Sequence, residues 1–292
     1  MTYAIRRDGA PARLADIATT PDDIDKDEAE RRFAALQDEL EDLQELLYAA
    51  GTQALLVVLQ GMDTSGKDGA IRHVFASMDP QGVRVAAFKQ PTPLERAHDF
   101  LWRVHQQVPE HSMAVVFNRS HYEAVIVERV KEIVPVRVWE RRYAQINGFE
   151  DLLIDSGTIL VKCYLHISRD EQAERLLSRE RDIEKAWKLD PGDWKERAHW
   201  DAYMAAYDEA LTRCATPRAP WFIVPADKKW FRDLAIAQAV ADALRPHRDA
   251  WLAVLRARSQ RELAAIDALR NGGDDEGGGD GGGGDSDDSD SE

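Results

Sequence analysis

A phosphate-binding pattern lies at positions 61–69 of the chain. The stretch reads GMDTSGKDG and places two glycines and a lysine in the spacing G-x-x-x-x-G-K. Glycines let successive backbone N–H groups converge on phosphate oxygens, and the lysine supplies positive charge for the distal phosphates. An apolar run precedes the stretch and a helical pattern follows it, so a helix N-terminus adds positive potential. We therefore expect phosphate to bind at Gly61, Thr64, Ser65, Gly66, Lys67, Asp68 and Gly69.

Two acidic side chains make this loop unusual for an anion site. Asp68 stands where such loops carry Ser or Thr, and Asp63 lies inside the loop. A carboxylate beside phosphate is tolerable where a divalent cation lies between them, or where the carboxylate caps the following helix. Asp63 can recruit such a cation or accept a proton from an attacking phosphate oxygen. The alternative interpretation of Asp63 is a residue that only stabilises the turn.

A second polar stretch, VFNRSHYE at 116–123, follows another apolar run. In enzymes with a phosphate-binding loop, the end of this strand carries an acid that supports Mg²⁺, and Asn118 is a weaker, neutral ligand at that place. Arg119 can make bidentate contacts with phosphate, although a structural salt bridge is the alternative. We infer that Asp63 compensates for the missing acid. Asp63 and Asn118 are then the metal ligands, with Mg²⁺ as the expected ion and Mn²⁺ as an alternative.

Apolar runs and helical patterns alternate along the chain. Short apolar runs predict strands at 54–59, 83–88, 113–117, 158–167 and 221–224. Apolar residues at spacings of three and four, with charges between them, predict helices at 22–50, 69–78, 93–107, 124–132, 138–147, 170–181, 234–244 and 251–269. This alternation predicts an α/β fold in which helices cover both faces of a parallel sheet.

The predicted organisation has four parts. Residues 1–50 form an N-terminal extension with a long helix, and residues 51–250 form the core that contains the loop. Within the core, residues 181–210 are rich in charge and tryptophan around a Pro-Gly turn signal, which is typical of a mobile helical lid. Residues 251–270 form a C-terminal helix. Residues 271–292, rich in Gly, Asp and Ser, are predicted to be disordered.

Charge and hydropathy exclude several classes of protein. The net charge is -15 over 292 residues, which argues against nonspecific duplex binding, so no nucleic-acid partner is expected. No apolar run is long enough to span a membrane and the N-terminus lacks a secretory signal. Cys163 and Cys214 have no close Cys or His partners and are predicted to be buried, inert thiols. These features favour a cytoplasmic protein.

Several motifs in order resemble those of the polyphosphate kinase 2 family. They are LQGMDTSGKDGAIRHVF (59–75), DPQGVRVAAFKQPTPLE (79–95), VFNRSHYEAVIVERV (116–130), EKAWKLDPGDWKER (184–197) and PWFIVPADKKWFR (220–232). The resemblance covers roughly residues 32–244. Asn118, where other members carry Asp, resembles the class III branch, which moves phosphate from inorganic polyphosphate to AMP and ADP. The acidic tail lies outside the resemblance.

The resemblance implies a three-layer P-loop fold like that of thymidylate kinase, with a five-stranded parallel sheet, a helical lid and Mg²⁺-dependent phosphoryl transfer. It implies catalytic roles for Asp63, Lys67, Asn118 and Arg119. It also implies that the acceptor nucleotide is bound by Glu123 and Arg129. The residues that it implies for the polyphosphate chain are Arg179 and Lys188 of the lid and Lys229 and Arg232 of the DKKWFR motif. The implied assembly is a dimer or tetramer.

Alternatives stay open for several of these residues. Glu123 and Arg129 can be ordinary surface charges of a helix, and Lys229 and Arg232 can form a solvated turn. Because the protein is acidic, polyphosphate requires a local basic channel, for which the candidates are Arg72, Lys89, Arg119, Arg179, Lys188, Lys229 and Arg232. Other functions consistent with the loop are an ATP-dependent nucleotide kinase and a non-catalytic sensor of polyphosphate or nucleotide. The acceptor can be AMP, ADP or a guanine nucleotide, with ATP as a product or reverse substrate.

Overall fold

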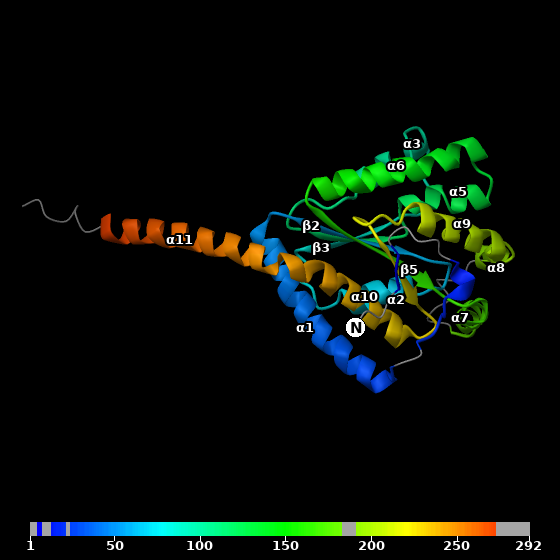
Figure 1. The fold of residues 1–292 in the computed structure, drawn as a ribbon, viewed down its shortest axis with the longest axis horizontal. Coiled ribbons are helices and arrows are strands. Elements are labelled where there is room, and N and C mark those ends of the chain that lie inside the picture. Colours follow the sequence, from blue (N-terminus) through cyan, green and yellow to red (C-terminus); the bar gives the residue numbers. More distant parts are fainter. Residues whose placement is uncertain (1–4, 8–12, 22–23, 183–190, 273–292) are drawn as a thin grey trace, which may run out of the picture.

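The computed structural model describes residues 5–7, 13–21, 24–182 and 191–272. Its centre is a six-stranded sheet in the order β1-β6-β5-β2-β4-β3 (Figure 1). Five neighbouring strands are parallel and β1 pairs antiparallel with β6 at one edge. The strands are β1 (Ile5–Arg7), β2 (Ala54–Gln60), β3 (Val83–Ala87), β4 (Ala114–Asn118), β5 (Thr158–His166) and β6 (Trp221–Pro225).

The predicted five-stranded parallel sheet is confirmed, and the sequence missed only its sixth strand. β1 is three residues long, too short for an alternating pattern to stand out. The central strands β2 and β5 are buried along their whole length, which explains their continuous apolar runs. The carboxyl ends of β2 and β4 are neighbours, since Leu59 pairs with Asn118. The loop after β2 and the turn after β4 therefore lie at the same edge of the sheet.

Helices cover both faces of the sheet, giving three layers (Figure 1). One face packs against α1, α2 and α10, and contributes Leu55, Val57 and Leu59 to that core. The other face packs against α6 and α9 and contributes Leu56 and Val58. The helices are α1 (Lys26–Ala50), α2 (Lys67–Val74), α3 (Pro93–Arg96), α4 (Trp102–His105), α5 (Val127–Val130), α6 (Val136–Asp155), α7 (Arg169–Arg181), α8 (Pro191–Arg197), α9 (Trp200–Arg213), α10 (Lys229–Leu244) and α11 (Arg248–Gly272).

Short 3-10 turns join some of these elements, at η1 (Leu14–Asp16), η2 (His121–Ala124) and η4 (Arg245–His247). The last helix, α11, starts against the end of α1 and then extends away from the body (Figure 1). Its distal apolar side chains, Leu263, Ile266 and Leu269, are exposed. None of the helices in the described ranges is long and apolar enough to cross a membrane.

Three predicted helices differ from the structure. The segment predicted as one helix at 93–107 forms two single turns, α3 and α4, because Thr92 caps the first turn and Asp99 accepts backbone N–H groups before the second. The helix predicted at 138–147 is longer and runs from Val136 to Asp155. The helix predicted at 124–132 is only the turn α5 preceded by η2. Helical periodicity alone locates such segments but not their ends.

The predicted lid and tail fall partly outside the described residues. Of the segment 181–210, the structure describes α8, α9 and the end of α7, while residues 183–190, including Lys188, lie outside the described ranges. The tail predicted to be disordered lies outside them from residue 273 onward. The domain boundaries proposed from the sequence stay predictions.

Candidate active site

The loop between β2 and α2 wraps around the ammonium group of Lys67. The Lys67 Nζ donates hydrogen bonds to the carbonyl oxygens of Gly61 at 2.7 Å and Met62 at 3.0 Å. Gly66, with φ of 100°, and Thr64, with φ of 64°, both adopt the left-handed region that turns the backbone back on itself. The buried hydroxyl of Thr64 has no hydrogen-bond partner among the described residues. An unpaired donor beside a buried cation is what a bound phosphate oxygen would satisfy.

Burial of Lys67 changes its protonation. Removal from water and, to a smaller extent, the nearby charge of Arg119 together lower the pKa of Lys67 to about 8, against the opposing effect of Asp63. A phosphate anion in the loop would favour the charged form and reverse this shift. The loop therefore holds a buried cation whose charge is best stabilised when an anion binds.

Arg175 of α7 fixes the outer side of the loop. Its guanidinium donates to the carbonyl oxygens of Thr64 at 3.0 Å and Ser65 at 3.1 Å. The same group donates to the carbonyl oxygens of Ala226 at 2.6 Å and Asp227 at 2.9 Å, just after β6. One planar side chain thus ties the phosphate-binding loop to a separate strand end. Sequence analysis did not single out Arg175, because an arginine within a charged helix carries no distinctive signal.

Arg232 lies behind the loop. It is only 1% exposed and forms an ion pair with Asp233, with the closest contact at 2.6 Å. A Cβ added to Gly66 would lie 2.1 Å from Arg232 Nη1, and one added to Gly69 would lie 3.2 Å from its Nη2. Both glycines are therefore needed for close approach of this guanidinium. The structure places Arg232 against the back of the loop rather than on an open channel.

The turn after β4 brings two predicted residues to the loop. The side-chain amide of Asn118 donates to Asp68 Oδ1 at 2.7 Å. This contact joins the start of α2 to the end of β4. The Asp68 carboxylate thus accepts a hydrogen bond from a neutral amide group.

Arg119 joins the two acidic residues of the site. Its Nη2 lies 2.6 Å from Asp63 Oδ1, and its Nη1 lies 3.3 Å from Glu123 Oε2. Burial alone would lower the pKa of Arg119, but the carboxylates of Glu123 and Asp63 outweigh it and raise that pKa. The backbone of Arg119 has φ of 61°, a conformation that L-residues adopt at some energetic cost. Arg119 therefore forms salt bridges in this structure. Its two partners are Asp63, which is predicted to bind metal, and Glu123, which is predicted to bind the nucleotide.

A small cavity opens beside this cluster. Its volume is about 60 Å³, and it is lined by Gly61, Met62, Asp63, Arg119, Glu123, Val127, Lys131, Glu196, Tyr203 and Tyr207. The lining combines acidic and basic side chains with Tyr203 and Tyr207 of α9. Among them, Lys131, directly after α5, forms an ion pair with Glu196 of α8 at 2.7 Å, and Tyr203 also donates to Glu196. Sequence analysis missed Lys131, Glu196, Tyr203 and Tyr207, whose proximity depends on how α5, α8 and α9 pack.

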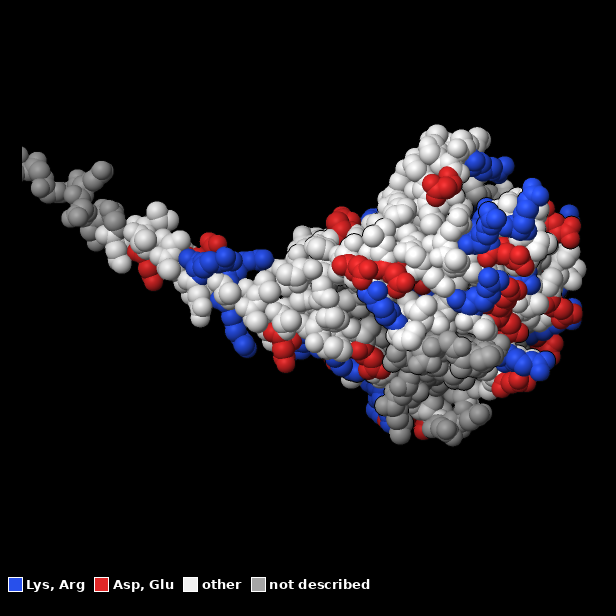
Figure 2. Space-filling model, turned by 45° about the horizontal axis from the view of Figure 1, so that its top comes forward, with Lys and Arg blue, Asp and Glu red and all other residues white. Residues whose placement is uncertain are grey.

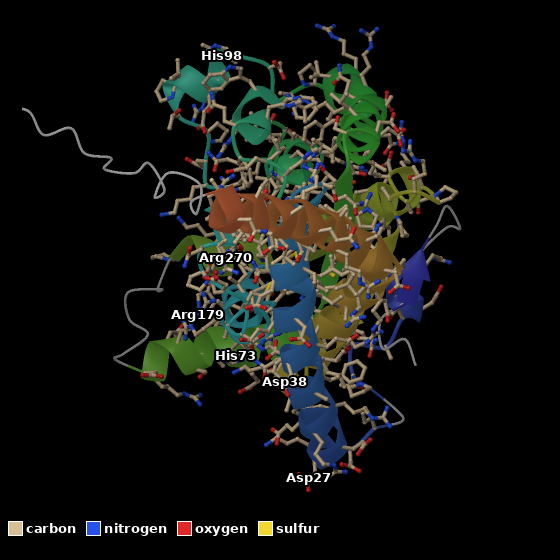
Figure 3. The ribbon with its side chains drawn as sticks, turned by 90° about the vertical axis from the view of Figure 1, so that its left-hand side faces the viewer. Asp27, Asp38, His73, His98, Arg179 and Arg270 are labelled. Atoms are coloured by element: carbon tan, nitrogen blue, oxygen red, sulfur yellow. The ribbon has the colours of Figure 1, made fainter. Side chains whose placement is uncertain are left out.

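Other predicted residues lie away from this cavity. Arg129 binds Glu209 and the Tyr143 hydroxyl, and its guanidinium lies 4.4 Å from the Trp139 ring centroid. Arg179 pairs with Asp193 at 3.0 Å, joining α7 to α8, and is labelled on its helix in Figure 3. Lys229 is exposed at the start of α10. On the face shown in Figure 2, basic and acidic side chains are interspersed rather than gathered into one basic surface.

Oxygen ligands for a divalent cation are available at the cavity. Asp63 and Glu123 both face Arg119 there, and carboxylate oxygens are the ligands that Mg²⁺ prefers. No cluster of three or more His, Cys, Asp or Glu side chains with metal-binding geometry occurs among the described residues. A Mg²⁺ ion that keeps several waters and bridges to phosphate oxygens needs only one or two protein carboxylates, so the donor set fits.

The fold and the site define a class of protein. A glycine-rich loop between a buried parallel strand and a helix, with a lysine inside the loop and an arginine at the next strand end, is the arrangement of P-loop phosphotransferases. The comparison with protein families agrees, since the model of polyphosphate kinase 2 (PPK2) matches residues 23–250. The chain belongs to the polyphosphate kinase 2 family.

Relatives with curated names and solved structures fit this assignment. An AMP/ADP-polyphosphate phosphotransferase of Meiothermus ruber is 50% identical over 219 residues, which are 75% of this chain and 82% of that protein. An ADP-polyphosphate phosphotransferase of Rhodopseudomonas palustris is 43% identical over 217 residues, which are 70% of this chain and 75% of that protein. The crystal structure of polyphosphate kinase 2 from Arthrobacter aurescens TC1 has a TM-score of 0.79 and 45% identity, covering 82% of this chain and 87% of that one.

Proposed function

We propose that this protein transfers the terminal phosphate of inorganic polyphosphate to AMP and to ADP, forming ADP and ATP. The observation that carries the proposal is the convergence of Lys67, Asp63 and Arg119 at one edge of the sheet, beside a cavity with an aromatic wall. A relative that is 50% identical bears the name AMP/ADP-polyphosphate phosphotransferase, which supports both acceptors.

The residues of the site suit phosphoryl transfer, in which positioning and charge stabilisation supply most of the catalysis. In this proposal Lys67 exchanges its carbonyl partners for phosphate oxygens. Arg119 turns from Asp63 and Glu123 to the transferred group and stabilises its charge. The loop from Gly61 to Gly69 supplies backbone N–H donors, and Arg232 adds positive charge from behind.

A Mg²⁺ ion, with Mn²⁺ as the alternative, would be held by Asp63 and Asn118, as the sequence predicts, with Glu123 as a further oxygen ligand. When bound, the ion neutralises charge on the phosphate oxygens as it develops. Asn118 can contribute its side-chain oxygen while its Nδ2 still donates to Asp68, because these are different atoms of the amide. Turning Arg119 away from Asp63 would free the carboxylate oxygen that Arg119 contacts.

The acceptor nucleotide would bind at the cavity beside Glu123, with its rings toward Tyr203 and Tyr207 and its phosphate toward Arg119. The cavity, of about 60 Å³, is smaller than a nucleotide, so its lining would have to open around the ligand. Arg129 would contact the nucleotide phosphate only after leaving Glu209. Arg179, Lys188 and Lys229 are proposed to contact the polyphosphate chain outside the loop. A homo-oligomer, dimer or tetramer, is part of the proposal, and guanine nucleotides are further candidate acceptors.

Phosphoryl transfer by the purified full-length chain tests the proposal. Long-chain polyphosphate and Mg²⁺ are offered with AMP and with ADP separately, and ATP with dTMP serves as the control pair. We expect ADP and ATP to form from polyphosphate, and Asp63→Ala and Lys67→Ala to abolish that activity. Asp38→Ala, on the outer side of α1 (Figure 3), is the matched control and should retain full activity.

Two outcomes would contradict the proposal. Turnover with ATP and dTMP but none with polyphosphate would mean that the donor is ATP. Binding of polyphosphate or nucleotide without any turnover would mean that the protein is a sensor. Activity with ADP alone would keep polyphosphate as the donor and remove AMP as an acceptor.

A further inference from the structure

A cluster of buried polar side chains lies beneath the turn that carries Arg119. Its centre is an ion pair between Lys162 of β5 and Glu150 of α6, with Nζ 2.6 Å from Oε2. Lys162 also donates to the Tyr122 hydroxyl at 3.1 Å and to the Cys214 carbonyl at 2.6 Å. The other carboxylate oxygen of Glu150 accepts from the Tyr122 hydroxyl at 2.7 Å and lies 3.2 Å from His121 Nε2. All of these side chains are nearly inaccessible to water.

Buried charges of this kind demand an explanation. Removing a carboxylate and an ammonium group from water is costly, and their attraction repays that cost only when the remaining hydrogen bonds are also made. Here they are made, because three donors approach the two oxygens of Glu150. Burial alone would raise the pKa of Glu150, but Lys162 and His121 hold that pKa below its usual value, so the group stays ionised. A fixed anion at this point holds its donors in one orientation.

Two of the donors to Glu150, His121 and Tyr122, belong to the turn that follows Arg119. His121 and Tyr122 begin η2, two and three residues after Arg119. Between them and Arg119, the Ser120 hydroxyl oxygen accepts from the Tyr122 backbone N–H at 3.2 Å and from Gln60 Nε2 at 3.0 Å. The chain immediately after Arg119 is thus anchored to α6, β5 and the end of β2.

The backbone conformation of Arg119 requires such an anchor. With φ of 61° the residue lies in the left-handed region, which is energetically costly for a non-glycine residue. On its N-terminal side, the Arg119 backbone N–H donates to Leu59 O of β2 at 3.1 Å. Strained conformations persist where the surroundings determine them, and the surroundings here are the partners of Glu150.

We propose that Glu150 is a positioning residue for phosphoryl transfer, holding η2 through His121 and Tyr122 so that the Arg119 guanidinium is directed into the cavity. The proposal rests on the role proposed above for Arg119. Glu150 is no catalytic residue, since it is not part of the cavity lining and its carboxylate contacts His121, Tyr122 and Lys162. Its effect on the reaction is indirect and passes through the turn.

The first test is Glu150→Gln in the full-length chain. The substitution keeps the shape of the side chain but weakens its hold on His121, Tyr122 and Lys162. We expect kcat with polyphosphate and ADP to fall about ten- to a hundredfold while KM for ADP changes less than about threefold. Asp151→Asn, at the neighbouring position on α6 where the carboxylate is exposed beside Arg218, is the matched control and should change neither constant.

A double-mutant cycle with Arg119→Lys separates positioning from general destabilisation. If Glu150 acts through the Arg119 guanidinium, Glu150→Gln should lower kcat much less in the Arg119→Lys background than in the wild type. Its effect on the melting temperature should be equal in both backgrounds. Equal loss of kcat in both backgrounds would overturn the proposal, as would a folded Glu150→Gln protein with unchanged kcat.

Two further outcomes are separated by design. If Arg119→Lys alone retains full kcat, the proposed role of Arg119 fails, and the positioning proposal fails with it even where polyphosphate remains the donor. If Glu150→Gln does not fold, the variant Glu150→Gln/Lys162→Met carries the test, because it removes both buried charges together. A folded double variant with wild-type kcat would then reject the proposal, and one with low kcat despite a normal melting temperature would support it.

Discussion

Two lysines are buried in the described part of the chain, one on each side of the active site, and they are held in opposite ways. Lys67 donates to the backbone carbonyls of Gly61 and Met62, and no carboxylate of the described residues lies within hydrogen-bond distance of it. Lys162 is paired directly with Glu150. The ammonium group of Lys67 is available to an anion from outside the protein, whereas that of Lys162 is already paired with Glu150. A buried cation held by backbone carbonyls and a hydroxyl group is typical of a binding site, whereas one paired with a buried carboxylate has a structural role.

The same contrast applies to the two walls of the site. The loop wall is shaped by local glycines and by Arg175 of α7, which donates to backbone carbonyl oxygens of the loop. The wall that carries Arg119 is shaped by side chains from α6 and β5, far along the chain. Substitutions of equally buried residues in the two walls should therefore differ in their effects on stability and activity.

The largest expected effect is that of Lys67→Met. We expect kcat/KM with polyphosphate to fall by about a thousandfold or more, because the charge that stabilises the transferred phosphate is lost. The free protein should nevertheless become more stable, by about 1–2 kcal/mol, since a buried cation without a carboxylate partner is removed. Activity assays and urea unfolding would check this, and a loss of stability would break the contrast between the two lysines.

Lys162→Met should have the opposite effect on stability to Lys67→Met. It leaves Glu150 charged and unpaired in the interior, so we expect the free energy of unfolding to fall by about 3 kcal/mol. Adding Glu150→Gln to this variant should recover most of that loss. The measurement is urea unfolding of the single and double variants, and a single variant as stable as the wild type would contradict the role of the pair.

Gly66→Ala tests the loop wall without changing charge. The added Cβ would lie 2.1 Å from Arg232 Nη1 at a residue with φ of 100°, so both the arginine and the backbone must shift. We expect about 2 kcal/mol of destabilisation and a strong loss of polyphosphate turnover. The control is Gly148→Ala in α6, where a Cβ meets nothing within 4 Å and should stabilise the helix slightly. Similar thermal unfolding of the two variants would show that the close approach to Arg232 is unimportant.

The smallest expected effect is a dependence of stability on pH in the free protein. The pKa of Lys67 is lowered to about 8 in the folded state, so above that pH the unfolded chain binds more protons than the folded one. Stability from this group is therefore lowest below about pH 8 and rises with pH, by about 1 kcal/mol between pH 8 and 9. Urea unfolding of the wild type and of Lys67→Met at pH 8 and at pH 9 isolates the contribution of Lys67. An equal change in the free energy of unfolding of the two proteins between these pH values would contradict the prediction.

Features that depend on one short segment could be predicted from the sequence, whereas contacts between segments far apart in the chain could not. Gly61, Lys67 and Arg119 were predictable because their spacing lies within single strand–turn segments. Arg175 and the pair of Glu150 with Lys162 were not, since an arginine in a charged helix and a lysine inside an apolar strand have meaning only beside their partners. The segment 93–107 was misread because helical periodicity persists across Asp99, which ends one turn and starts the next.

The position of β1 has a consequence for the order in which the fold is completed. Its residues Ile5–Arg7 precede the other described strands in the chain, yet they pair with Trp221–Ile223, more than two hundred residues later. Thr19 and Leu14, which follow β1, likewise bind Asp227 and Asp208 from the later part of the chain. During translation β1 therefore cannot pair until β6 has emerged. The strand that comes earliest in the sheet's sequence order thus joins the sheet only after the strand that comes latest has formed.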